Sequence, residues 1–125
     1  TLREETRAMK YQVHQVQLTD AEVDKINAEG HDAVERHAMK LKMYFSDDPD
    51  GLRTIAGRMY ELGYYEHVAN VTADCLEHVF YVGNEDPEYG VEPLTRRSSV
   101  SVGDLIICEN GDKWVVAKFG FDRVR

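Results

Sequence analysis

The sequence predicts a single α+β domain, in which a small, mainly antiparallel sheet with a C-terminal β-hairpin is packed by three to four helices. Three observations lead to this class. Apolar residues repeat at helical spacing over much of residues 20–80, short runs rich in β-branched residues flank and interrupt those repeats, and Asn110-Gly111 is a strong hairpin signal near the end. The 125 residues fit one domain, which we expect to span residues 9–125. Residues 1–8 are polar and have no apolar pattern, so we expect a tag or a disordered extension there.

The first strand and the first helix are predicted by adjoining signals. Residues 9–18, MKYQVHQVQL, alternate imperfectly, but their β-branched and aromatic members favour a strand. The next four residues, Thr19-Asp-Ala-Glu22, have the spacing of a capping box, in which the Thr19 hydroxyl and the Glu22 carboxylate each accept a hydrogen bond from the other residue's amide. A helix is therefore expected to begin near Asp20.

The next helices are separated by glycine and by a turn. Gly30 interrupts the apolar repeat, so either one helix continues through it at a cost of ~1 kcal/mol or the helix breaks there and a new one starts near Asp32. We favour the break, because Gly30 is typical of a helix end. Residues 46–51, SDDPDG, predict a turn or helix cap. The apolar residues from Leu52 to Leu62 then repeat at helical spacing, and Gly63 stands where a helix commonly ends.

The second half of the chain begins with a strand and a short helix. Residues 64–71 predict the strand, residues 72–74 a cap, and the apolar positions of residues 76–80 the helix. Residues 83–95 contain two of the three prolines and no periodicity, which predicts a loop of a length that is often functional or mobile.

The C-terminal hairpin is the clearest prediction of the second half. Residues 100–104 lead into an apolar strand at residues 105–108, and the turn at Asn110-Gly111 leads into a return strand at residues 113–117. We expect residues 119–121 to end the domain.

Charge and composition exclude several classes of protein. Fifteen Lys and Arg stand against 23 Asp and Glu, which gives a net charge of −8 and argues against a generic DNA or RNA binder. No run approaches the ~18 apolar residues of a membrane-spanning helix, and no leader pattern is evident, so a cytoplasmic location is expected. The two cysteines, Cys75 and Cys108, stand in apolar company without a CxxC motif and are expected to be reduced core thiols.

The negative charge is concentrated within the sequence. Residues 59–95 contain eight acidic residues and no Lys or Arg. The acidic surface candidates are Glu85, Asp86, Glu88 and Glu92. Such a stretch attracts basic surfaces. It predicts either a partner-binding surface, with inhibition by DNA mimicry as one alternative, or a solvated face that aids solubility.

No catalytic, metal or cofactor motif emerges from the sequence. The five histidines do not form a metal-ligand pattern, and His31 and His37, six residues apart, do not share one face of a helix. The serines near residue 100 lack a nucleophile elbow, and neither a P-loop nor a dinucleotide-binding glycine pattern is present. We therefore expect no enzyme activity, no metal and no cofactor.

The segment from residue 96 to residue 104 is the most specific part of the sequence. Gly103 permits a turn with positive φ before the apolar strand. Adjacent arginines and a serine cluster predict an anion or partner site, while compensation of the acidic face is the structural alternative. The candidate residues are Arg96, Arg97, Ser98, Ser99, Ser101 and Asp104.

The C-terminal half resembles a known pattern. Residues 99–107, SVSVGDLII, are followed by Asn110-Gly111 and by Lys118-Phe-Gly-Phe121. This resembles small uncharacterised proteins of phages, plasmids and bacteria that carry an R-S-x-S-V-G-D-hydrophobic element, a short hairpin and a terminal G-F, a pattern similar to that of the YodL-like domain. With a short helix before it, the likeness covers roughly residues 64–122. The resemblance implies a phage or mobile-element origin and carries no assigned chemistry.

Together these observations predict a non-enzymatic accessory protein that binds a host protein, without direct contact to nucleic acid or membrane. One alternative is a domain or enzyme that binds a small anionic ligand through Arg96, Arg97 and the serine cluster. Another is a homo-oligomer that pairs through a strand edge or an apolar helix face.

Overall fold

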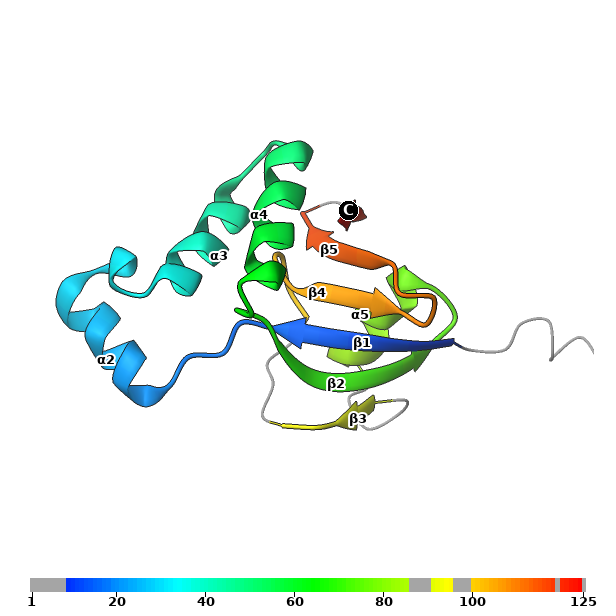
Figure 1. The fold of residues 1–125 in the computed structure, drawn as a ribbon. Helices are drawn as coiled ribbons and strands as arrows, with labels where there is room; N and C mark the ends of the chain where they lie inside the picture. Colours follow the sequence, from blue (N-terminus) through cyan, green and yellow to red (C-terminus); the bar gives the residue numbers. More distant parts are fainter. Residues whose placement is uncertain (1–8, 86–90, 96–99, 119, 125) are drawn as a thin grey trace, which may run out of the picture.

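A six-stranded sheet organises the molecule (Figure 1). The computed structural model describes residues 9–85, 91–95, 100–118 and 120–124, with the backbone alone for residues 81–85. The strands are β1 (Met9–Gln15), β2 (Glu66–Ala73), β3 (Val91–Pro93), β4 (Leu105–Cys108), β5 (Lys113–Ala117) and β6 (Gly120–Val124). Their order is β3-β2-β1-β4-β5-β6, and every neighbouring pair is antiparallel. The predicted α+β class with its C-terminal hairpin is confirmed.

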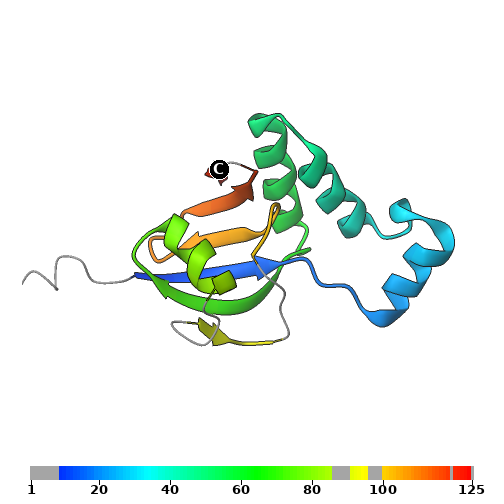
Figure 2. The same cartoon turned by 180° about the vertical axis from the view of Figure 1, so that it is seen from behind.

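Helices lie on both faces of the sheet. In the described parts of the chain they are α2 (Asp20–Glu29), α3 (Glu35–Phe45), α4 (Pro49–Glu61) and α5 (Leu76–Glu85), with the short 3-10 helix η1 (His31–Ala33) between α2 and α3. Figure 2 shows α5 against one face, while α4, with α3 beside it, covers the other face near β4 to β6. None of these helices is both long and apolar enough to cross a membrane.

The sheet separates two apolar cores. Because side chains alternate along a strand, Leu105 and Ile107 of β4 enter the core under α3 and α4, while Ile106 enters the core under α5. All three side chains are buried, which explains why β4 is a continuous apolar run rather than an alternating one. The α4 core contains Met43, Leu52, Ala56, Met59, Leu105, Ile107, Val115 and Val124.

Local signals set the ends of the helices as the sequence predicts. The Thr19 hydroxyl accepts from the Glu22 amide at 3.1 Å, and the Glu22 carboxylate accepts from the Thr19 amide at 2.8 Å, so the capping box is confirmed. Gly30, with φ of 103°, ends α2, which confirms the break at this glycine. The Asp48 side chain accepts from the Asp50 amide at 3.1 Å and begins α4.

Several predicted boundaries are wrong. Residues 31–33 form η1, so α3 begins at Glu35 and not near Asp32. The first strand ends at Gln15 rather than at residue 18. The second strand runs to Ala73, because residues 72 and 73 pair with β1, and therefore residues 72–74 are not simply a helix cap.

Two strands lie where none is predicted. Within residues 83–95, taken as a loop, α5 continues to Glu85 and β3 pairs with residues 69–71 of β2. Beyond the predicted hairpin, β6 pairs with β5 along its whole length. Both strands are short and contain charged residues or proline. They depend on pairing with the adjacent strand rather than on an alternating pattern of apolar residues in their own sequence.

The prediction of two core thiols is wrong for Cys75, whereas Cys108 is partly buried and packs against the core under α5. Cys75 is exposed because it lies between the end of β2 and the start of α5, and Cys108 is half-buried at the end of β4. Both are free thiols, in agreement with the prediction that they are reduced.

Candidate functional site

The predicted ligand segment, residues 96–104, is described in part. Four of its candidates lie outside the described residues: Arg96, Arg97, Ser98 and Ser99. Ser101 is exposed, whereas Asp104 is fully buried. The two described candidates therefore do not face solvent together.

Asp104 lies in a buried network of hydrogen bonds. Its Oδ2 accepts from Gln15 Nε2 at 3.0 Å and from the Ser101 amide at 2.9 Å, and Lys40 Nζ lies 3.5 Å from Oδ1. Burial raises the pKa of Asp104, while the Lys40 charge and the two hydrogen bonds act in the opposite direction. A buried carboxyl needs such partners, so this arrangement ties residues 101–104 to β1 and α3 and supports the fold.

Gly103 completes this structural cluster. Its φ is 93°, and a Cβ at this position would lie 3.3 Å from the end of the Met43 side chain. Its carbonyl accepts a hydrogen bond of 2.6 Å from the Tyr65 hydroxyl. The Val-Gly-Asp sequence is thereby explained by packing and turn geometry.

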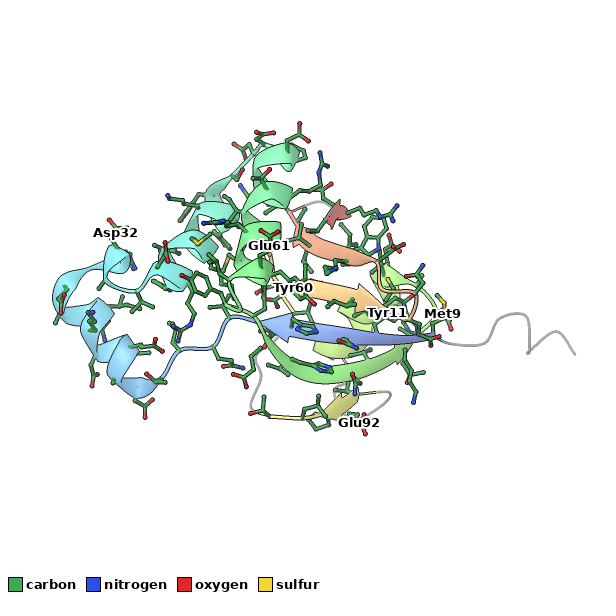
Figure 3. All side chains as sticks on the ribbon, viewed as in Figure 1. Met9, Tyr11, Asp32, Tyr60, Glu61 and Glu92 are labelled. Carbon is green, nitrogen blue, oxygen red and sulfur yellow. The ribbon has the colours of Figure 1, made fainter. Side chains whose placement is uncertain are left out.

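The acidic stretch is spread over several elements. Asp86 and Glu88 lie outside the described residues, and the Glu85 side chain is also not described. Glu92 is exposed on β3 and accepts from Asn70 Nδ2 at 2.9 Å. The other described acids of the stretch are Glu61 on α4, Glu66 and Asp74 near the two ends of β2, and Glu77 on α5. Figure 3 shows Glu61 beside α4 and Glu92 at the β3 edge, well separated.

A second acidic region, which the sequence patterns did not single out, projects from the molecule. The helices α2 and η1, here called the arm (residues 20–33, all of them described), extend away from the sheet (Figure 1). Within the arm Ile26 alone is buried, and Val23 is 41% exposed. Five acidic side chains and one basic side chain, Lys25, belong to it: Asp20, Glu22, Asp24, Lys25, Glu29 and Asp32.

Arg36 of α3 fastens the arm to the body. Its Nε donates to the Gln17 carbonyl at 3.0 Å, and its guanidinium pairs with the Glu22 carboxylate. The hydrogen bond from Arg36, and after it that from the Thr19 amide, lowers the pKa of Glu22 to about 2. The arm therefore has a defined attachment although it buries little surface.

Two histidines meet where the arm joins α3. His31 Nδ1 and His37 Nε2 lie 3.1 Å apart, and the ring centroids are 5.3 Å apart. As predicted, the two residues do not share one face of a helix, but they meet because they lie on separate elements. The extended Val34 between η1 and α3 redirects the chain and lets the two rings meet, a turn that the sequence patterns did not indicate.

A second histidine pair lies on the sheet. His14 of β1 and His67 of β2 face each other in the register, with rings stacked at 4.7 Å. Their Nε2 atoms contact amide oxygens of Gln12 at 3.0 Å and Asn70 at 2.8 Å. Burial and, to a smaller extent, His67 lower the pKa of His14 to about 4.

Two grooves on the body differ in their chemistry. A groove of about 740 Å³ follows α4 and includes Arg53, Arg58, Tyr60 and Lys113. Lys113 Nζ lies 4.9 Å from the centre of the Tyr60 ring, a cation–π contact. Another groove, of about 420 Å³, is mainly apolar and is lined in part by the aromatic residues Tyr44, Phe80 and Phe121.

Neither clusters of possible metal ligands nor comparisons with known proteins point to a function for this chain. In the described ranges, no group of three or more His, Cys, Asp or Glu is placed to hold a metal ion. Comparison with protein-family models, with curated proteins and with solved structures finds no match for this chain. The resemblance to the YodL-like pattern therefore stays a prediction.

Proposed function

We propose that the protein is a non-enzymatic accessory protein that binds a host protein, and that the arm is its contact element. The observation that carries this proposal is the projection of α2 and η1 away from the sheet, with Ile26 as the buried side chain among the arm's described residues. The arm adds little to either core.

The energetics of the arm support a role in binding. A helix of ten residues is marginal in water without tertiary packing, yet α2 has a complete capping box and an ion pair that fastens it. These features hold an exposed helix in a defined position. Pre-organisation of this kind lowers the entropy lost when a partner binds.

The charge of the arm indicates the chemistry of the partner. Five acidic residues against one lysine produce a negative surface, which steers a positively charged protein surface toward it. Val23, exposed on α2, adds an apolar contact point. We therefore infer a basic partner surface with a small apolar patch.

A pair of charge-matched variants tests this proposal. The arm variant carries Asp24→Asn, Glu29→Gln and Asp32→Asn, and it leaves the capping box and the Arg36 ion pair intact. The body variant carries Glu61→Gln, Glu66→Gln and Glu92→Gln, which removes the same charge from the acidic stretch of residues 59–95. A photo-crosslinking residue at position 23 first identifies the partner in host cells, and calorimetry with that purified partner then measures affinity.

We expect the arm variant to lower the affinity for the partner at least about tenfold. The affinity of the body variant should stay within about twofold of the wild type. Equal losses of affinity in the two variants would show that binding depends on overall charge. A loss of affinity in the body variant alone would place the contact on the acidic stretch of residues 59–95. If position 23 crosslinks to no protein, the arm is not the contact element.

The groove along α4 supports a second candidate function, the binding of a small anionic ligand. Among the described residues, Arg58 and Lys113 have no carboxylate within 4.0 Å, whereas Arg53 pairs with Asp50 and Asp122. Arg58 and Lys113 could donate to a phosphate or carboxylate in a groove that Asp50 and Glu61 also line.

Sodium pyrophosphate is a suitable probe of this groove. It should raise the melting temperature of the wild type and not that of the Lys113→Met variant. Lys118→Met, at a lysine that pairs with Asp47 outside the groove, is the matched control. An equal shift in all three proteins would reject the groove as the site.

A further inference from the structure

The geometry at the junction of the arm and α3 points to a binding site for a divalent transition-metal ion of the zinc class, held by His31 Nδ1 and His37 Nε2. The two nitrogens lie 3.1 Å apart and come from separate elements, η1 and α3. This inference is independent of the identity of any protein partner.

The separation of the two nitrogens suits chelation. Zinc binds imidazole nitrogen at about 2.0–2.1 Å, so two such ligands in a tetrahedral site lie about 3.3–3.4 Å apart. The observed 3.1 Å differs from this by a few tenths of an ångström, a change that rotation of the exposed His31 ring supplies. Imidazole is also a preferred ligand of zinc, nickel and copper.

Metal binding would replace the proton that now joins the rings. In the hydrogen-bonded pair one nitrogen carries the proton and the other accepts it. A metal ion takes both lone pairs, and each ring then keeps its proton on the other nitrogen. Burial, His31 and Lys40 lower the pKa of His37, which favours its neutral, metal-binding form at neutral pH.

The backbone between the two histidines makes the pairing specific. In a continuous helix, residues six positions apart would point in directions about 120° apart around the axis. Val34, with φ of −122° and ψ of 116°, is extended between η1 and α3, so the chain changes direction between the two histidines. The two rings therefore meet across a junction.

The two imidazole nitrogens carry the site. Among the described residues, the charged neighbour beside His37 is Lys40, a cation, so local charge does not add to the attraction of a metal ion. Two imidazoles leave coordination positions for water, so an exchangeable site is expected rather than a closed structural one. A bound metal would link η1 to α3 and hold the arm more firmly.

The other histidine pair provides an internal control. His14 and His67 are stacked face to face, and the Nε2 atom of each already contacts an amide oxygen. The two pairs thus contain the same side chains in different geometries. A site that depends on geometry should involve the first pair and not the second.

The test is a titration of the metal-stripped full chain with zinc chloride at about pH 7.5, followed by calorimetry and by NMR of the imidazole signals. We expect one equivalent to bind and the signals of His31 and His37 to shift. His31→Gln and His37→Gln should each lower the association constant at least about tenfold, while the double variant His14→Gln/His67→Gln should retain it.

Three results would overturn the inference. The first is the absence of zinc binding by the wild type, and the second is undiminished binding by both single variants. The third is an equal shift of the same signals with magnesium chloride, because magnesium prefers carboxylates and water, and such a result would place the ion on the acidic side chains of the arm. Far-UV circular dichroism of each variant confirms that the fold is retained.

Discussion

The sheet body and the arm differ in how much of their surface they bury and in the interactions that hold them in place. The body buries two apolar cores on either side of one sheet, and even its buried carboxyl, Asp104, has partners for its oxygens. The arm exposes most of its side chains and is kept in place by a capping box and the Arg36 ion pair. Stability therefore resides in the body, and accessible charge is displayed on the arm.

The largest expected contrast between the two regions is in their response to truncation of apolar side chains. Met59 of α4 is fully buried, so Met59→Ala should lower the free energy of unfolding by about 3 kcal/mol. Val23→Ala, on the arm, should lower it by about 0.5 kcal/mol or less. Urea denaturation of both variants measures the difference, and similar losses would show that the arm is part of the cooperative core.

A smaller loss is expected from the buried polar network. Asp104→Ala would remove the carboxylate that accepts from the Gln15 side-chain amide and from the Ser101 backbone amide, at a cost of about 2 kcal/mol. Ser101→Ala, which keeps the backbone amide and removes an exposed hydroxyl, should change stability by less than about 0.5 kcal/mol. If both variants unfold at the wild-type urea concentration, the network does not hold this turn in place.

The histidine pair of the body predicts a dependence of stability on pH. The pKa of His14 is lowered in the folded state from its ordinary value of 6.5 to about 4, so the unfolded chain takes up the proton first. The free energy of unfolding should therefore fall as the pH is lowered from about 6.5 to about 4 and should not change through this group above that range. Because solvent partly screens this half-buried site, we expect the free energy of unfolding to fall by about 1–2 kcal/mol over that pH range.

The difference between the wild type and His14→Gln isolates this effect from other titrating groups, among which His67 stacks on His14 and Tyr60 contacts its edge. Urea unfolding at several pH values between about 4 and about 7.5 gives the two curves. Parallel curves would assign the dependence to groups other than His14.

The smallest effect on global stability is expected at the arm's cap. Thr19→Ala removes the hydroxyl that accepts from the Glu22 amide and should destabilise α2 locally by about 1 kcal/mol. Because the arm contributes little to the cores, global unfolding should move by only a few tenths of a kcal/mol. Hydrogen exchange at the α2 amides should accelerate severalfold while exchange in β1 is unchanged. Equal acceleration in both would show that the arm does not unfold independently of the body.

Features determined by neighbouring residues could be predicted from the sequence. The capping box at Thr19 and Glu22, the break at Gly30 and the return strand of the C-terminal hairpin each depend on a few adjacent side chains, and all are present in the structure. Their physical cause is local hydrogen bonding or backbone conformation.

Features that depend on residues distant in the sequence could not be predicted from it. The strand β3 has three residues, and its pairing with β2 defines it more than any pattern of its own. Asp104 belongs to a turn by its sequence, and Gln15, 89 residues away, helps to make it a buried network. The meeting of His31 and His37 depends on the extended residue Val34, a turn that was not predicted, and on how α3 packs against α4.

The position of β1 within the sheet has a consequence for how the chain must fold. Tyr11, on the first strand, pairs with Val71 on one side and with Cys108 on the other, so β1 is an internal strand whose partners are synthesised much later. Contacts so distant in sequence are slow to form. While the chain emerges from a ribosome, β1 therefore exposes unpaired backbone until β4 has been made, and this interval is when the protein is most open to a chaperone or to aggregation.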